Sequence, residues 1–424
     1  MIIHTVNDGD TLYKLASTYG VSIEEITKIN EIDPNDTLVI GQTLVIPTNT
    51  MEYIVKSGDT LYSIAQRLKV PLESLVKSNP QITNPAQIRI GDKLTIEDTN
   101  GKLRSIEVNG YALPGIDYDV LIKTLPNLTY ISIFSYQIKN DGTFDPIDDE
   151  EIINEAKKFN VAPLMVITNI GDRGFDSNIT RAILNNQEIR TSLIQNLITT
   201  MKNKGYYGLN VDFEYIYPED REAYNTFVQE LSEQLALNNL KLFTALAPKE
   251  SERQTGLLYQ AHDYAFHGRY VDRIVLMTYE WGYLYGEPQA VSPINPIRNV
   301  LNYAVKVIPS EKILMGMSNY GYDWTLPYKQ GTPAKTLSNT GAVKLARKVG
   351  ANIEYNEKDQ SPFFTYYSQN VKHIVWFDDA RSYFARLKLV DEYNLAGVSY
   401  WTINQYYPQN WLVLNDLYDI VKVV

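Results

Sequence analysis

The sequence predicts an α/β protein in which a (β/α)8 barrel follows two copies of a small βααβ module. Two observations predict this organisation. Residues 2–47 recur as residues 52–97, and from residue 107 to residue 424 strand-like runs alternate with helical patterns. The alternation is interrupted at about 325–390 by a stretch rich in tyrosine and phenylalanine with strand-like pieces of its own. This stretch predicts a small α+β insertion after the seventh strand.

Two blocks of sequence define the duplicated module. Gly9–Leu12 matches Gly58–Leu61, and Ile40–Leu44 matches Ile90–Leu94. In each copy a short strand leads to an acidic residue that can cap a helix (Asp10 in the first copy), and apolar residues follow at helical spacing before a closing strand. The module is therefore a strand, two helices and a strand, and we expect the repeats and the barrel to have separate cores.

Eight strand-like runs are the basis for the barrel. Most are separated by helical patterns, such as those at about 187–204 and 219–238, and eight strands that alternate with helices are the pattern of a (β/α)8 barrel. The runs are 106–112, 129–136, 162–169, 208–214, 242–247, 273–279, 312–318 and 397–403.

The fourth of these runs carries the acidic residues on which the functional prediction depends. Val211 and Phe213 alternate with Asn210, Asp212 and Glu214, so the three polar side chains share one face of the strand. In a barrel wall the apolar face meets the helices and the polar face lies at the mouth, where two carboxylates converge in a catalytic layout. The alternative is an exposed edge strand with hydrated acids, which the flanking helices disfavour.

Composition excludes several classes of function. The net charge is −11, from 39 basic and 50 acidic residues, and no basic run could follow a phosphate backbone, so nucleic acid is not expected as a partner. The absence of cysteine excludes disulfides and thiolate chemistry. The histidines are scattered, which predicts packing or surface roles, no metal site and no cofactor. They are His4, His262, His267 and His373.

Membrane and targeting signals are also not expected. No apolar run reaches the roughly 18 residues that a membrane span needs. The strand-like start at residues 2–6 has no basic or apolar region typical of a secretory signal. We expect a monomer, and the 32 tyrosines would suit a polar ligand such as a sugar.

The repeated blocks resemble LysM domains, small modules that bind glycans containing N-acetylglucosamine, such as peptidoglycan and chitin. The resemblance implies that sugar lies between residues 8–12 and residues 30–38 of the first copy. Residues 57–61 and 79–87 are the equivalent segments of the second copy. The alternative is a pair of spacers that bind nothing.

The acidic strand resembles a family motif. Asn210–Glu214 looks like the second half of the D-x-x-D-x-D-x-E motif of family 18 glycoside hydrolases, TIM-barrel enzymes that include chitinases and related N-acetylglucosaminidases. The resemblance extends through Met277–Tyr279 to Ser399–Trp401. Tyr207 and Asn210 stand where the motif has its first two aspartates. The asparagine amide can donate an N–H to the carboxylate that follows and contribute to substrate binding.

The positions of the two acids favour one mechanism. Asp212 and Glu214 come from the same strand and approach a sugar from one side, and no second acidic motif faces them, so a protein nucleophile is not evident. The resemblance implies substrate-assisted retaining catalysis. Glu214 would protonate the leaving oxygen and later activate water, while Asp212 would orient the 2-acetamido N–H and stabilise its developing positive charge.

The resemblance also implies roles for residues near the ends of other strands. Tyr279 would be catalytic, as the donor to the acetamido carbonyl, and the neighbouring Glu280 would bind a sugar hydroxyl. Trp401 would form an apolar floor under the pyranose. Tyr320 and Trp324, after the seventh strand, are further candidates for the substrate cleft.

Two repeats on such a barrel, with asparagine at the second motif position, resemble the spore cortex-lytic N-acetylglucosaminidases of spore-forming bacteria. This implies hydrolysis of cortex peptidoglycan or its fragments during germination, at the spore and without a signal peptide. One alternative is a chitinase or chitooligosaccharide hydrolase. A second is a non-catalytic, lectin-like protein of the spore surface, which the presence of Glu214 disfavours. Release of new reducing ends would separate an enzyme from a binding protein.

Overall fold

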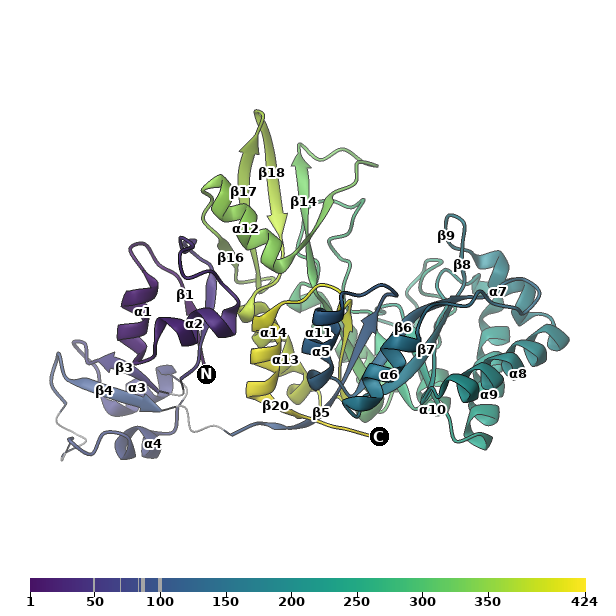
Figure 1. Ribbon diagram of the computed structural model, residues 1–424, viewed down its shortest axis with the longest axis horizontal. Coiled ribbons are helices and arrows are strands. Elements are labelled where there is room, and N and C mark those ends of the chain that lie inside the picture. Colours follow the sequence, from purple (N-terminus) through teal and green to yellow (C-terminus); the bar gives the residue numbers. More distant parts are fainter. Residues whose placement is uncertain (49, 69, 83, 85–87, 98–100) are drawn as a thin grey trace.

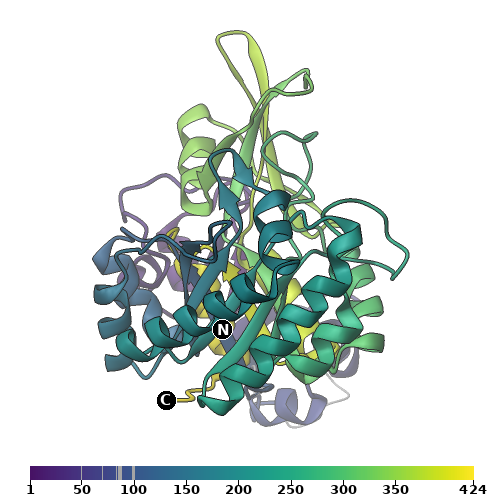
Figure 2. The ribbon, with the colours of Figure 1, turned by 90° about the vertical axis from the view of Figure 1, so that its right-hand side faces the viewer.

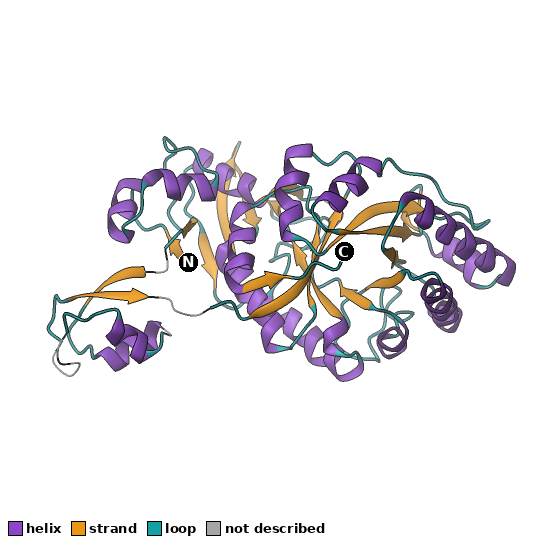
Figure 3. Cartoon of the chain, turned by 60° about the horizontal axis from the view of Figure 1, so that its bottom comes forward, coloured by secondary structure: helices purple, strands orange, loops and turns teal. Residues whose placement is uncertain are grey.

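The computed structural model describes residues 1–48, 50–68, 70–82, 84, 88–97 and 101–424. Its largest part is a closed barrel of parallel strands, as predicted (Figure 3). The strands follow one another around the ring in chain order, and the last pairs with the first. They are β5 Arg104–Ala112, β6 Tyr130–Gln137, β7 Ala162–Thr168, β10 Gly208–Asp212, β11 Lys241–Leu246, β12 Arg273–Leu276, β13 Ile313–Ser318 and β19 Gly397–Trp401.

Helices cover the outside of this ring (Figure 2). Local sequence fixes their ends. For example, Asn186 accepts two backbone N–H groups at the start of α8, and Gly205, with φ of 75°, ends it in the left-handed conformation. The helices are α5 Tyr118–Thr124, α6 Glu150–Lys158, α7 Ser177–Leu184, α8 Gln187–Lys204, α9 Arg221–Leu237, α10 Tyr264–Tyr270, α11 Ile294–Val307, α13 Ala380–Glu392 and α14 Pro408–Leu417.

Short elements complete the barrel. Three 3-10 turns, at Leu125–Asn127, Pro218–Asp220 and Ser310–Lys312, lie next to helices or strands, and β8 Ile170–Gly171 pairs with β9 Gly174–Phe175. The terminal strand β20 Tyr418–Ile420 pairs in parallel with β5. No helix among the described residues has both the length and the apolar character to cross a bilayer.

Two of the strands end earlier than the sequence predicts. The runs 208–214 and 273–279 were expected as strands, but β10 ends at Asp212 and β12 ends at Leu276. After β10 the Glu214 N–H donates to a side chain of the neighbouring strand segment instead of continuing the ladder. Beyond β12 the backbone N–H groups of residues 278 and 279 bond to carbonyls two residues earlier, which turns the chain out of the sheet. Both turns lie where the functional residues are.

The insertion after β13 is an antiparallel sheet with one helix, and it rises above the barrel (Figures 1 and 2). Its first strand begins at Tyr320, earlier than the expected 325. The expected end at 390 falls inside α13, which lies among the barrel helices. The strand order is β15-β14-β18-β17-β16. The elements are β14 Tyr320–Leu326, β15 Lys335–Ser338, α12 Asn339–Val349, β16 Glu354–Asn356, β17 Ser361–Ser368 and β18 Val371–Trp376.

The N-terminal repeats both have the predicted βααβ fold. The cap of α1 differs from the expectation, because Thr11 accepts the N–H at the helix start while Asp10 bonds to His4 and to the N–H of Asn7. The elements are β1 Ile2–Thr5, α1 Leu12–Tyr19, α2 Ile23–Asn30 and β2 Thr43–Ile46 in the first repeat, and β3 Thr50–Ile54, α3 Leu61–Leu68, α4 Leu72–Lys77 and β4 Lys93–Glu97 in the second.

The expectation of separate cores holds only in part for the first repeat, which has a hydrophobic cluster of its own but also contributes residues to other clusters. Val39 of this repeat is buried in the hydrophobic cluster of the insertion, with Ile353 and Phe364 among its neighbours. The second repeat also has a hydrophobic cluster made of its own residues, and none of its described residues joins the clusters of the barrel or the insertion. The two copies therefore share a fold but differ in how they are attached to the rest of the chain.

Candidate active site

A cavity of about 230 Å³ opens at the carboxyl ends of the barrel strands. Five of the residues predicted from the sequence lie in its wall: Asp212, Glu214, Tyr279, Glu280 and Trp401. The other lining residues are mostly aromatic or aliphatic, and they are Tyr111, Phe134, Phe175, Pro248, Leu258, Tyr259, Met277 and Trp281. An apolar cavity with a few convergent acids is the usual form of a small-molecule site.

Asp212 is the last residue of β10 and lies in the wall of this cavity. Its side chain is only 5% exposed, and its Oδ1 atom has no hydrogen-bond partner among the described residues. Burial raises the pKa of Asp212 from 3.8 to about 7, because the charged form loses its hydration. A buried acceptor without a protein donor is suited to take an N–H from a ligand.

Glu214 follows two residues later, beyond the end of the strand, and is partly buried. Burial raises the pKa of Glu214 well above its usual range, and the negative charges of Asp212 and Glu280 raise it further. Because the charge of Asp212 opposes ionisation of Glu214, Asp212 loses its proton first. The pair can therefore hold one carboxylate and one carboxylic acid together, as acid catalysis beside an anion requires.

Three polar side chains from outside the predicted motif hold the backbone around Glu214. Asn169, buried after β7, accepts the Glu214 N–H at 3.0 Å and donates to the Glu214 carbonyl at 2.8 Å. His262 lies 3.0 Å from the Phe213 carbonyl, and the Ser177 hydroxyl donates to the next carbonyl, that of Tyr215. These contacts fix the direction in which the Glu214 side chain leaves the chain.

The hydrogen bonds of His262 define its protonation state. Nδ1 accepts the Ala247 N–H at 2.9 Å, so the proton lies on Nε2 and is donated to the Phe213 carbonyl. Burial lowers the pKa of His262 to about 4, which keeps the ring neutral. The expectation of a packing role is therefore met, with a positioning role in addition. A single histidine and a single asparagine carry no pattern that could have identified His262 or Asn169 from the sequence.

Replacing Asn169 with alanine should lower kcat about 10- to 100-fold with little change in KM, because the acid would lose its alignment while the cavity wall remains. Steady-state kinetics on a chromogenic N-acetylglucosaminide would measure both constants. The exposed Asn154→Ala on α6 is the matched control. A normal kcat in folded Asn169→Ala would show that these two hydrogen bonds do not position Glu214.

Asn210 does not have the expected contact with Asp212. It is fully buried inside the barrel below the cavity, where its amide donates to the hydroxyls of Tyr111 at 2.8 Å and Ser132 at 3.2 Å. Both N–H groups are thus used by β6 and β5, two and three strands further along the ring, rather than by the acid two residues along. Asn210 lies outside the cavity wall. Its place in the structure is to join β10 to β5 and β6.

Tyr279 and Trp401 form two sides of the cavity. Burial raises the pKa of the Tyr279 hydroxyl well above its usual value, so it keeps its proton and is available as a donor. The Trp401 ring is held edge-on by Tyr111 and Phe134, with ring centroids 5.4 Å and 4.7 Å away. Such contacts fix the orientation of a flat apolar surface beside the acids.

Glu280 connects the cavity to the insertion. One of its carboxylate oxygens accepts hydrogen bonds from the hydroxyls of Tyr320 and, at 2.9 Å, Tyr322, both on β14. Desolvation raises the pKa of Glu280, and the two hydroxyls oppose this shift. The Trp324 indole donates to the Gly286 carbonyl at 2.9 Å. Tyr320 and Trp324 therefore lie behind the cavity wall and support it, rather than in the wall as expected.

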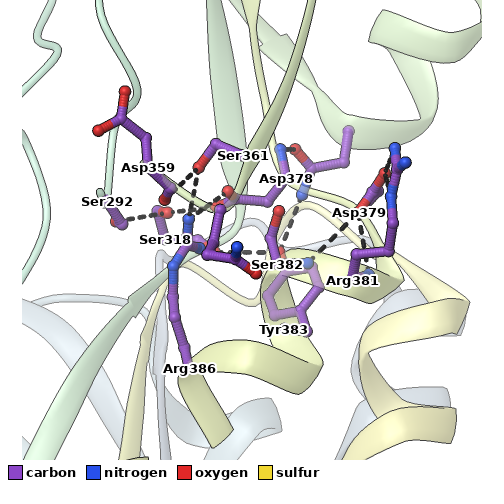
Figure 4. Close-up of polar contacts among 12 residues, drawn as sticks. Ser292, Ser318, Asp359, Ser361, Asp378, Asp379, Arg381, Ser382, Tyr383 and Arg386 are labelled. Atoms are coloured by element: carbon purple, nitrogen blue, oxygen red, sulfur yellow. Dashed lines mark hydrogen bonds and ion pairs between the residues drawn. The ribbon is translucent and has the colours of Figure 1, made fainter. Parts of the chain in front are cut away.

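A buried polar network fixes the far end of the loop that follows Glu280 (Figure 4). Ser292 and Ser318 share a hydrogen bond of 2.8 Å, and Ser318 donates to Asp378 at 2.7 Å. Arg386 on α13 pairs with Asp378 at 2.7 Å and donates to Ser361 of the insertion at 3.0 Å. The network ties the barrel, the insertion and this loop into one body. Among the described residues, no three or more histidine, aspartate or glutamate side chains are placed to hold a metal ion.

Comparison with known proteins agrees with this geometry. The model of the family "Glycosyl hydrolases family 18" matches residues 106–405, and the LysM domain model matches residues 4–47 and 53–97. The chain therefore belongs to family 18 of the glycosyl hydrolases, and it is a glycosidase with two LysM domains.

The most informative relatives have the same domain organisation. The chain is 43% identical to the "Cortical fragment-lytic enzyme" of Bacillus subtilis (strain 168), over 100% of this chain and 99% of the relative. It superimposes on the spore cortex-lytic enzyme SleL of Bacillus megaterium QM B1551 with a TM-score of 0.89 at 37% identity, covering 100% and 99% of the two chains. For SleL of Bacillus cereus the TM-score is 0.87 at 40% identity, covering 99% of this chain and 98% of that one.

Proposed function

We propose that this glycosidase cleaves N-acetylglucosaminyl bonds of spore cortex peptidoglycan, or of fragments of it, by substrate-assisted catalysis with retention. The observation that carries the proposal is the unpartnered, buried Oδ1 of Asp212, which shares a cavity with Glu214 and Tyr279. A 2-acetamido group offers one N–H and one carbonyl, which these side chains can bind. The cortex as the source of substrate is supported by the names of the two kinds of relative, cortical fragment-lytic enzyme and spore cortex-lytic enzyme.

The reaction would proceed in two displacements. Glu214 donates its proton to the glycosidic oxygen while the acetamido oxygen attacks the anomeric carbon, which breaks the glycosidic bond and forms an oxazolinium ring. Asp212 accepts the acetamido N–H and stabilises the positive charge, and Tyr279 donates to the acetamido oxygen. The Glu214 carboxylate then takes a proton from water as the water oxygen attacks the same carbon and opens the ring.

The protonation states required by this scheme follow the order of the two pKa values. Burial places the pKa of Asp212 at about 7 in the protein alone. An amide N–H donor and a developing positive charge both favour the carboxylate, so substrate should complete its ionisation. Glu214 keeps its proton until the leaving oxygen takes it, because its own pKa lies well above the usual range.

Two displacements at one carbon should give a product with the configuration of the substrate. A β-linked substrate is therefore expected to release the β-hemiacetal first, before mutarotation. Proton NMR of a short digestion of cortex fragments would resolve the two anomers and would also reveal the new reducing end. Early appearance of the α-anomer would contradict the mechanism, and no new reducing end would contradict the activity.

The LysM domains would hold the enzyme on insoluble glycan and so raise its local concentration at the bonds it cuts. We place the protein at the spore, in the coat and cortex. It would act as a monomer, which light scattering of the purified protein can test.

A further inference from the structure

The two LysM repeats lie in different surroundings. The first is packed against the side of both the barrel and the insertion, while the second lies beyond it, at the end of the molecule away from the barrel (Figures 1 and 3). The second repeat reaches the first through contacts between β3 and α1. A module embedded in a body and a module at its end are not equally free to bind an insoluble polymer.

The backbone of the first repeat contacts the insertion directly. The Ile353 N–H of the insertion donates to the Ile40 carbonyl at 2.8 Å. A Cβ atom on Gly41 would lie 1.8 Å from the Ile353 carbonyl oxygen, so no other residue fits there without movement of the chain. Gly91 occupies the same place in the second repeat, with a similar positive φ, and a Cβ there would meet nothing within 4 Å. The same motif glycine is thus an interface residue in one copy only.

Buried polar contacts join the first repeat to the barrel. Gln409 of α14 accepts the Thr43 hydroxyl at 2.7 Å, and its amide donates to the Thr43 carbonyl at 2.7 Å and to the Asn30 side chain at 3.1 Å. All three residues are at least nine-tenths buried. Satisfied polar groups at a buried interface specify one docking geometry, because any displacement leaves them unpaired.

The insertion contacts the loop that follows α2. Arg347 of α12 donates to the Thr37 carbonyl at 2.8 Å and forms an ion pair with Asp36. On the barrel side, Lys123 pairs with Glu31 at 2.9 Å. Glu31, Asp36 and Thr37 belong to the 30–38 segment that was expected to contact sugar. A cavity of about 310 Å³ lies between this segment and α12, so this side of the expected glycan groove faces the catalytic body.

We propose that the first repeat is a structural part of the catalytic body, where it holds the insertion against the barrel, and that the second repeat alone binds insoluble glycan. This rests on the proposed glycan-binding function of the repeats. The two halves of the proposal are tested by different measurements.

The structural half is tested by the matched glycine pair Gly41→Ala and Gly91→Ala in the full chain. Both substitutions place alanine at positive φ, 84° and 92°, so the intrinsic backbone strain is common to both. Calorimetry should show that Gly41→Ala lowers the main melting transition by several degrees, while Gly91→Ala leaves it unchanged. Equal effects on the main transition, or none from Gly41→Ala, would overturn the structural assignment.

The binding half is tested in a Glu214→Gln background, which prevents digestion, by sedimentation with insoluble peptidoglycan sacculi. Ile64→Asp and Leu15→Asp disrupt the equivalent core positions of the second and first repeats. Ile64→Asp should weaken binding about 10²-fold and leave the main melting transition in place. Leu15→Asp should keep sacculus binding, and Gly41→Ala provides a milder change to the same repeat if Leu15→Asp does not fold.

The outcomes separate this inference from the proposed function. Loss of sacculus binding in Leu15→Asp or Gly41→Ala that equals the loss in Ile64→Asp would show that the first repeat also binds glycan. Failure of the Glu214→Gln parent to sediment with sacculi would instead refute glycan binding by the repeats. That second result would leave the melting data of the glycine pair as a valid test of docking.

Discussion

Glu214→Gln should lower kcat by about 10²- to 10⁴-fold, the usual contribution of a general acid. Glutamine keeps the shape of the side chain and the hydrogen bonds of the backbone to Asn169, but it has no proton to give to the leaving oxygen. The fold and glycan binding should therefore survive. Hydrolysis of a chromogenic N-acetylglucosaminide and release of reducing ends from cortex fragments would measure the loss.

The exposed Glu188→Gln on α8 is the control for this substitution, because it makes the same chemical change far from the cavity. It should retain full activity. If the Glu214→Gln variant kept a kcat near that of Glu188→Gln, another group would have to supply the proton, and the assignment of Glu214 would be wrong.

Asp212→Asn should lower kcat by about 10²- to 10³-fold, since the amide cannot stabilise a developing positive charge. Its pH dependence should also change. Ionisation of Asp212 sets the acidic limb of the kcat/KM profile near its pKa of about 7, and the asparagine variant has no such group to titrate. The residual activity of Asp212→Asn should therefore not fall between pH 8 and pH 6 as that of the parent does.

The same substitution should stabilise the fold above neutral pH. The folded protein holds the Asp212 proton up to about pH 7, whereas the unfolded chain loses it near its ordinary value of 3.8. Between these values the folded state binds more protons, so the free energy of unfolding falls as the pH rises. Asparagine carries no charge to bury, and it should add on the order of 2–4 kcal/mol at pH 8 and almost nothing at pH 3.5.

Denaturant unfolding of the parent, Asp212→Asn and Glu188→Gln at these two pH values would measure the difference. A stability gain that did not depend on pH would mean that burial of the charged Asp212 carboxylate does not lower the free energy of unfolding. The contrast between lost activity and gained stability is expected of a group that is buried for function.

The sequence predicted the barrel well because its signal is periodic. Alternating strands and helices leave a repeated pattern over the whole domain, and the alternation around Asp212 correctly placed Val211 and Phe213 in the core against the helices. The ends of β10 and β12 were not predictable in the same way. They depend on the Glu214 N–H that Asn169 accepts and on local turns after Leu276, which involve single residues without a pattern.

Contacts between segments far apart in the chain could not be predicted from the sequence. Gly41 and Gly91 occupy the same motif, yet only the structure shows that one of them touches Ile353. Asn210 was expected to bond along its own strand, but the closed ring places the Tyr111 and Ser132 hydroxyls closer to its amide. Tyr320 and Trp324 were expected in the cleft because of their position in the chain, and they support it from behind. Such contacts depend on how the folded elements are placed relative to one another.

The hydrogen bonds between the insertion and Glu280 have a consequence for the range of acidity in which the enzyme can work. The two phenol groups on β14 favour the charged form of Glu280. That charge in turn makes the Glu214 proton harder to remove. The insertion, which contributes no residue to the cavity wall, thereby extends the activity of the enzyme to higher pH. Substitution of its tyrosines could therefore change the pH range of the enzyme during evolution without altering any group that touches the sugar.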